Sequence, residues 1–220
     1  MNKMCKPSCA QLKMWKGKFG NEYTNRNALT LKEIDELYEK NYGINRSELN
    51  EIFVGNLNRS IKVLEVGSNI GIQLMLLQKM GFKNLYGIEI NSYAVERSKR
   101  NTKNINIIQG DAFDVPFKDS YFDLVFTSGV LIHIAPAEIQ KALKEIYRCS
   151  NKDIWGFEYY AENYTEVRYR GHEALLWKTD FASLYLDLFA DLELVKEKRL
   201  KYLNNENMDT MFLIRKRNKG

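Results

Sequence analysis

The chain has 220 residues and a mass of 25.8 kDa, which fits a single domain of ordinary size. Its 45% hydrophobic and 28% charged residues match globular proteins and exclude a disordered, collagen-like or coiled-coil chain. The longest mainly apolar stretch, 71–80, falls short of the roughly 20 residues that span a bilayer. No apolar segment follows the first lysines, so we expect no secretory signal. We therefore expect a cytoplasmic protein without a membrane partner.

The net charge of +5 is concentrated at the carboxyl end, where residues 196–220 hold eight basic and three acidic side chains. Because these residues overlap two predicted strands, the pattern favours a solvated sheet edge over a nucleic-acid surface. Three cysteines, an odd number, argue against a disulfide framework. Cys5 and Cys9 have a spacing that suits two zinc ligands, but a structural zinc site needs four. We expect free thiols and no metal.

The first sixty residues differ from the rest. Residues 1–28 show no periodicity, whereas apolar residues at helical spacing predict helices near 31–38 and 47–56. We interpret 1–60 as a lid or cap, not an independent domain, on a core formed by 61–220.

From residue 61 onward, short apolar strands alternate with helical patterns, as in a doubly wound sheet buried on both faces. Gly81 is expected to end the first helix of this part, and Asp180 to cap the last one. The predicted strands are 61–66, 84–90, 104–109, 122–127, 153–159, 192–198 and 208–215, and the predicted helices are 72–80, 136–146 and 181–188. The fold class is therefore α/β, a Rossmann-like, mostly parallel seven-stranded sheet whose last strand is antiparallel.

The first strand of this sheet leads into a glycine-containing loop, EVGSNIG, at residues 65–71. In doubly wound sheets, ligands bind beyond the carboxyl ends of the strands, where glycines let the backbone approach them. A dinucleotide-binding loop would need Gly at 67, 69 and 72, but Asn69 and Ile72 occupy two of these positions. The sequence therefore disfavours a nicotinamide or flavin site.

The loop resembles the E-x-G-x-G-x-G motif of class I S-adenosylmethionine-dependent methyltransferases, with Asn69 in the middle glycine position, which Asn tolerates. Residues 114–134 resemble the fourth strand of these enzymes and the loop after it. Glu89 is placed to accept hydrogen bonds from ribose hydroxyls, and Asp111 from the adenine amino group. The resemblance implies S-adenosylmethionine as cofactor and S-adenosylhomocysteine as product. The expected cofactor-binding residues are Tyr23, Arg26, Glu65, Gly67, Ser68, Asn69, Gly71, Glu89, Ile90, Asp111, Ala112, Thr127 and Ser128.

The segments at 15–27, 157–160, 166–172 and 175–182 resemble the methylases associated with pseudaminic acid biosynthesis, and the similarity covers nearly the whole chain. This resemblance implies a small sugar-linked acceptor, namely an amino sugar, a nonulosonic acid or its nucleotide-activated form, methylated on oxygen or nitrogen. Two alternatives stay open: an RNA or protein methyltransferase, and a non-catalytic S-adenosylmethionine-binding protein. We expect a monomer or a homodimer.

Candidates for proton transfer lie around the end of the fifth strand. His172 suits this role near neutral pH, although a structural role is equally open, and Glu158 and Tyr160 are further catalytic candidates. Acceptor binding is assigned to Tyr159, Arg168, Arg170 and His133. The two arginines would hold a carboxylate or phosphate, whereas His133 lies in an apolar run that favours a packing role.

The aromatic amino-terminal segment, with Trp15, Phe19, Tyr23 and Arg26, predicts a lid that closes on the cofactor and excludes water. Tyr23 and Arg26 would then lie near the methionine carboxylate. Simple packing of this segment on the core is the alternative.

Overall fold

The computed structural model describes residues 7–217, excepting the side chains of 7–10. The expectation of free thiols at Cys5 and Cys9 therefore lies outside the described residues. None of the described helices is long and apolar enough to cross a membrane.

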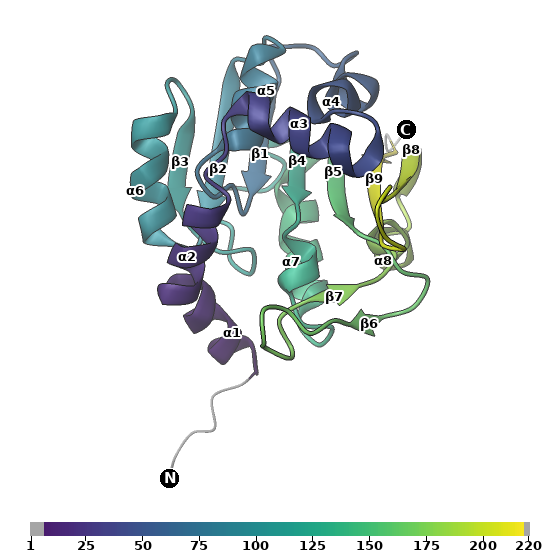
Figure 1. The fold of residues 1–220 in the computed structure, drawn as a ribbon. Helices are drawn as coiled ribbons and strands as arrows, with labels where there is room; N and C mark the ends of the chain where they lie inside the picture. The colour runs from purple at the N-terminus through teal and green to yellow at the C-terminus, as the bar shows by residue number, and fades with distance from the viewer. Residues whose placement is uncertain (1–6, 218–220) are drawn as a thin grey trace.

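A seven-stranded sheet forms the centre of the molecule (Figure 1). Its strands are β1 (Lys62–Val66), β2 (Asn84–Glu89), β3 (Asn106–Gln109), β4 (Phe122–Ser128), β5 (Ser150–Tyr159), β8 (Leu192–Lys201) and β9 (Met208–Lys216), in the order β3-β2-β1-β4-β5-β9-β8. Strands β1 to β5 pair in parallel, and β9 is antiparallel to both of its neighbours. The predicted fold class is confirmed. The antiparallel last strand lies between β5 and β8 and not at the edge.

Helices cover both faces of the sheet. Alternate strand residues point to opposite sides, and apolar residues on both sides need to be buried. Leu64 and Val66 of β1 face α7 (Ile139–Cys149) and α8 (Phe181–Leu188). Val63 faces the other layer, which contains α3 (Leu31–Tyr42), α4 (Arg46–Val54), α5 (Ile72–Lys79) and α6 (Ser92–Asn101). Both faces are buried, as the apolar strands predict. The predicted caps are also present, since Gly81 has a φ of +95° and Asp180 Oδ1 accepts the N–H of Ser183 at 2.9 Å.

The amino-terminal residues are more regular than their sequence indicates. Two short helices, α1 (Pro7–Lys16) and α2 (Lys18–Arg26), occupy the segment that shows no periodicity. They bury small and polar residues, among them Gln11, Gly20 and Thr24, rather than an apolar stripe. In Figure 1 α2 lies beside α6, and α1 continues below α2. The sequence pattern did not indicate α6 either, because this helix buries only Ala94, Val95 and Ser98.

Two further elements lie outside the predictions. A two-stranded hairpin of β6 (Thr165–Glu166) and β7 (Trp177–Lys178) follows β5, and a 3-10 turn, η1 (Leu131–His133), follows β4. In Figure 1 the hairpin lies below the sheet, toward the same end as α1. The segments after β4 and β5 thus approach the amino-terminal helices.

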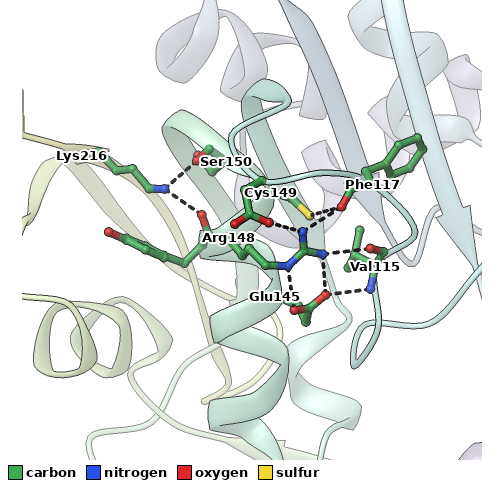
Figure 2. Close-up of polar contacts among 9 residues, drawn as sticks. Val115, Phe117, Glu145, Arg148, Cys149, Ser150 and Lys216 are labelled. Atoms are coloured by element: carbon green, nitrogen blue, oxygen red, sulfur yellow. Dashed lines mark hydrogen bonds and ion pairs between the residues drawn. The ribbon is translucent and has the colours of Figure 1, made fainter.

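The carboxyl end of α7 fastens the loop that follows β3 (Figure 2). The Arg148 guanidinium donates to the carbonyls of Val115 and Phe117 at 2.9 and 2.8 Å, and it pairs with Glu145 at 2.8 Å. Glu145 in turn accepts the Val115 N–H at 2.9 Å. On the other side, Lys216 Nζ donates to the Ser150 carbonyl at 2.6 Å, which joins β9 to the end of α7. The loop is held by charge-assisted hydrogen bonds, which are stronger than neutral ones.

Replacing Arg148 by Met should lower the free energy of unfolding by about 2–3 kcal/mol, because it leaves the loop carbonyls and Glu145 without their donor. Urea denaturation measures this change. Lys99→Met is the matched control, since Lys99 pairs with Glu96 on the surface with both side chains more than 60% exposed, and it should cost less than about 1 kcal/mol. Equal effects of the two substitutions would contradict the role of Arg148.

Candidate functional site

A cavity of about 530 Å³ opens at the carboxyl ends of β1, β2, β4 and β5, the edge at which doubly wound sheets bind ligands. The volume lies within the roughly 300–1,000 Å³ typical of small-molecule sites. The structure brings thirteen predicted site residues together in its wall: Tyr23, Glu65, Gly67, Ser68, Asn69, Glu89, Ile90, Asp111, Ala112, Ser128, His133, Tyr159 and Arg170.

The loop after β1 has the backbone geometry of a ligand-binding turn. Gly67, Asn69 and Gly71 have φ angles of +76°, +47° and +86°, the region that favours glycine and tolerates Asn. A Cβ atom on Gly67 would lie 2.5 Å from Val130 Cγ2, so only glycine lets this loop pass beneath the segment after β4. Gly71 shapes the loop without lining the cavity.

Glu89 ties this loop to the start of α6. Its Oε2 atom accepts the N–H of Asn69 at 2.8 Å, and its Oε1 atom accepts the N–H of Asn91 at 2.8 Å. The residue is only 8% exposed, and burial raises its pKa while these backbone hydrogen bonds oppose the rise. Each carboxylate oxygen has two acceptor positions, and the Ile90 backbone also contributes a hydrogen bond, so the carboxylate as a whole retains acceptor capacity for a ligand in the cavity.

Several buried polar atoms around this loop have no hydrogen-bond partner among the described residues. They are Glu65 Oε2, Ser68 Oγ, Asn69 Oδ1 and Gln73 Oε1, and all four residues line the cavity. Burial raises the pKa of Glu65 well above its ordinary value, although Arg46 opposes this shift. Unpaired buried polar groups are costly, so these atoms fit a polar ligand such as S-adenosylmethionine.

The amino-terminal helices are fastened to the cofactor side of the cavity through Asn91. Its Nδ2 atom donates to the Trp15 carbonyl at 2.8 Å and to Asn21 Oδ1 at 2.9 Å. Gly20 allows this contact, because a Cβ atom there would lie 2.5 Å from Asn91 Nδ2 and still closer to the Trp15 carbonyl oxygen. Asn25 adds hydrogen bonds with Tyr93 and Arg97 of α6 at 2.8 and 2.7 Å.

Aromatic rings join the amino-terminal helices to the segment after β4. Trp15 lies 5.2 Å from Tyr23 and 4.6 Å from His133, measured between ring centroids. His133 Nδ1 lies 2.7 Å from the Leu175 carbonyl, which can only accept, so Nδ1 carries the proton. Burial lowers the pKa of His133 to about 4. The ring is therefore neutral at pH 7 and packs into the cavity wall.

Other predicted residues lie away from the cavity. His172 and Arg168 are exposed on the segment after β5, and Arg26 is exposed at the end of α2. Tyr160 stacks against the Arg199 guanidinium, 4.0 Å from the ring centroid. For these four residues the structure shows no contact with the cavity, and their expected roles stay predictions.

Glu158, a predicted catalytic candidate, does not line the cavity, and its catalytic role stays a prediction. It is fully buried beneath η1, where it accepts the N–H groups of Val130 and Ile132 at 3.2 and 3.4 Å and a hydrogen bond from the buried Thr127. Burial raises the pKa of Glu158 to about 7. Glu158 and Thr127 together hold the loop after β4, and neither lines the cavity. Thr127 would therefore contribute to cofactor binding only through the position of this loop.

A polar cluster near the carboxyl end of β5 was missed entirely. Asp209, at the start of β9, is 1% exposed and lines the cavity with Tyr42 and Tyr202. Both phenols donate to its Oδ2 atom, Tyr202 at 3.1 Å. Antiparallel pairing sets Asp209 beside Tyr159, at the carboxyl end of β5. A charged residue at the start of an apolar strand was the signal that could have indicated it.

Comparison with known sequences agrees with this geometry. The family model described as "Methyltransferase domain" matches residues 64–153. Sterol methyltransferase-like 3 of Botryococcus braunii is 30% identical over 101 residues, covering 43% of this chain and 25% of that protein. An uncharacterized methyltransferase of Synechocystis is 32% identical over 87 residues, covering 40% of this chain and 41% of that protein. The chain thus spans between a quarter and two fifths of the length of these relatives.

Solved structures extend the similarity to nearly the whole chain. Magnesium protoporphyrin IX methyltransferase of Synechocystis PCC 6803, with bound S-adenosylmethionine, has a TM-score of 0.71 at 11% identity and covers 98% of this chain and 100% of that one. The [4+2]-cyclase SpnF has a TM-score of 0.60 at 15% identity, covering 78% and 80%. Such identities show the fold, which can host different reactions.

Residues 64–153 therefore match a methyltransferase domain, and this match agrees with the predicted enzyme class and cofactor.

The pH dependence of stability tests the position of Glu158. Because burial raises its pKa from 4.5 to about 7, its contribution to stability is fully present below about pH 4.5 and is lost as the pH rises through 7. Relative to Glu158→Gln, the wild type should lose up to about 3 kcal/mol over this window. Urea denaturation at several pH values measures the difference. Glu162→Gln, at an exposed position, is the control, and a constant difference for Glu158→Gln would refute the assignment.

Proposed function

We propose that the protein transfers a methyl group from S-adenosylmethionine to an oxygen or nitrogen of a small sugar-type acceptor, an amino sugar, a nonulosonic acid or its nucleotide-activated form. The observation that carries the proposal is the single cavity wall that joins the loop at Gly67, the buried Glu89 and the polar cluster at Asp209. The first two suit the cofactor, and the third suits a hydroxyl- or amine-bearing acceptor.

Residues of the chain would hold the cofactor at its ribose and at its adenine. Glu89 would accept the ribose hydroxyls with the acceptor positions left by Asn69 and Asn91, and Asp111 would accept the adenine amino group. When bound, S-adenosylmethionine supplies a methyl carbon that the acceptor's lone pair attacks in line, while the carbon–sulfur electron pair stays on sulfur and the attacking hydroxyl or amine gives up its proton. The protein's task is then to orient the two reactants and to exclude water.

The amino-terminal helices would perform the second task. Trp15 and Tyr23 place an aromatic surface over the cofactor side, and burial raises the pKa of Tyr23 so that its phenol stays neutral. We propose that α1 and α2 act as the expected lid, closing through the contacts of Asn91. The hydrogen bond from the Asn91 N–H to the Glu89 carboxylate would link the position of the lid to cofactor binding.

A sugar-type acceptor suits the polar character of the inner wall. Tyr159, Tyr202 and Asp209 offer three oxygen atoms that bind hydroxyl or amino groups. Arg170, exposed at the rim, would attract a carboxylate or phosphate. An acceptor as apolar as a sterol, the class in the name of one relative, would leave these groups unpaired. The wider resemblance to pseudaminic acid-associated methylases supports the same proposal.

Mass spectrometry tests the proposed function. Purified protein, S-adenosylmethionine and a panel of amino sugars, nonulosonic acids and their nucleotide-activated forms should give S-adenosylhomocysteine and one product heavier by a single methyl group. Calorimetry on the same samples establishes whether the cofactor binds. Binding without any product from the panel would count against the sugar-type acceptor and favour the macromolecular or non-catalytic alternatives.

The lid is tested by Gly20→Ala. The added methyl group meets the Trp15 carbonyl and Asn91 Nδ2, and overpacking of this kind costs about 1–3 kcal/mol. S-adenosylmethionine affinity, measured by calorimetry, should fall about tenfold. Glu22→Ala, on the exposed side of the same helix, is the matched control and should bind as the wild type does. Unchanged affinity in a folded Gly20→Ala protein would argue for simple packing of the segment.

A further inference from the structure

Asp209 is a buried carboxylate with one oxygen that accepts two hydrogen bonds and one oxygen that lacks a donor. Oδ2 accepts the hydroxyls of Tyr42 and Tyr202. Oδ1 has no hydrogen-bond partner among the described residues, although the side chain lines the cavity and is 1% exposed. A buried carboxylate oxygen that lacks a donor is unfavourable. The arrangement therefore points to a ligand that brings the missing donor.

Three separate parts of the chain build this position. Asp209 starts β9 beside Tyr159 of β5, Tyr42 ends α3, and Tyr202 follows β8. The rings of Tyr42 and Tyr202 lie 4.7 Å apart, so they wall the carboxylate with aromatic surface. The hydrogen bonds from both phenols fix its orientation, which leaves Oδ1 as the free acceptor.

Neighbouring cations do not satisfy Oδ1. The Lys178 ammonium donates to Asn207 and lies 5.6 Å from the Tyr159 ring centroid. The Arg46 guanidinium donates to Asn50 and Tyr38, both at 2.9 Å. Neither forms a hydrogen bond with Asp209, although both favour its ionised form through their charge. The donor must therefore come from the contents of the cavity.

The charges of the cavity wall indicate which donor fits. Among the described residues, Glu89, Asp111 and Asp209 contribute carboxylates and Arg170 contributes the guanidinium, exposed at the rim, whereas burial disfavours the charged form of Glu65 by raising its pKa. Clefts lined by one sign of charge concentrate ligands of the opposite sign. Aromatic rings beside a carboxylate further favour a cation, because their faces carry negative potential. A protonated amine meets all of these conditions better than a hydroxyl does.

We propose that Asp209 is a specificity residue that binds a primary ammonium group of the acceptor, with Tyr42, Tyr159 and Tyr202 around it. The inference rests on the proposed function and narrows its acceptor to an amine-bearing sugar. A protonated amine has no lone pair, so this contact orients the acceptor and is not the point of methyl attack. The methylated atom would be a different oxygen or nitrogen of the same molecule. Burial raises the pKa of Asp209 to about 7, and a bound ammonium would favour the ionised carboxylate.

Calorimetry with three sugars tests the proposal. Glucosamine carries the ammonium, N-acetylglucosamine keeps an N–H donor without the charge, and glucose has a hydroxyl at the same carbon. Each is titrated into wild-type protein saturated with S-adenosylhomocysteine. Glucosamine should bind at least tenfold more tightly than the other two. Equal affinities for the three sugars, or no measurable binding of glucosamine, would overturn the proposal.

Two variants then locate the contact. Asp209→Asn keeps one side-chain oxygen that can accept the hydroxyls of Tyr42 and Tyr202, but it removes the negative charge. This variant should lose the tenfold preference for glucosamine. Asp191→Asn is the matched control, because Asp191 Oδ2 also accepts a tyrosine hydroxyl, that of Tyr147 at 2.7 Å, outside the cavity. It should keep the preference. A preference retained in Asp209→Asn would overturn the assignment to Asp209.

Failure of this inference can be told apart from failure of the proposed function. S-adenosylmethionine affinity is measured in the same three proteins and should be alike, since Asp209 lies on the acceptor side. Cofactor binding and methylation of an uncharged sugar, with no preference for glucosamine, would contradict the role of Asp209 and leave the methyltransferase proposal standing. Should Asp209→Asn fail to fold, the comparison of glucosamine with N-acetylglucosamine in the wild type still decides whether an ammonium is recognised.

Discussion

The site depends on the two hydrogen bonds that Glu89 accepts from the N–H groups of Asn69 and Asn91. The first hydrogen bond fixes the loop after β1, in which Gly67, Asn69 and Gly71 have positive φ angles. The second fixes the start of α6, and the side chain of Asn91 then carries the amino-terminal helices. One buried carboxylate therefore determines both the floor of the cavity and the attachment of the segment above it. Any ligand that hydrogen bonds to Glu89 contacts this junction directly.

The two ends of the cavity differ because the strands of the sheet pair in parallel at one end and antiparallel at the other. At β1 and β2, parallel strands end in backbone turns whose N–H groups and unpaired oxygens suit a cofactor. At β5 and β9, antiparallel pairing sets the start of one strand beside the end of the other, so side chains from both contribute. Tyr159 and Asp209 meet there for that reason. The methyltransferase domain matched by sequence covers the first end, whereas the second end is built largely by residues outside it.

What the sequence predicted well is what is encoded locally. The strands, the left-handed positions around Gly67 and the acidic residue ending β2 each follow from a few consecutive residues. Asp209 was missed because its place depends on the register between β5 and β9, which lie about fifty residues apart. The helices α1, α2 and α6 were missed because they bury small and polar residues, such as Gly20 and Ser98, and so lack an apolar period. The burial of Glu158 beneath η1 could not be predicted, because strand alternation does not show which face of a strand a later loop covers.

A crystal structure with bound S-adenosylhomocysteine would test the central claim most directly. We expect the ribose hydroxyls on Glu89, the adenine near Asp111, and the sulfur atom facing the side of the cavity where Tyr159 and Asp209 lie. We also expect that α1 and α2 cover the ligand through the contacts of Asn91. A ligand bound elsewhere, or one whose ribose makes no contact with Glu89, would contradict the assignment of this cavity as the site of methyl transfer.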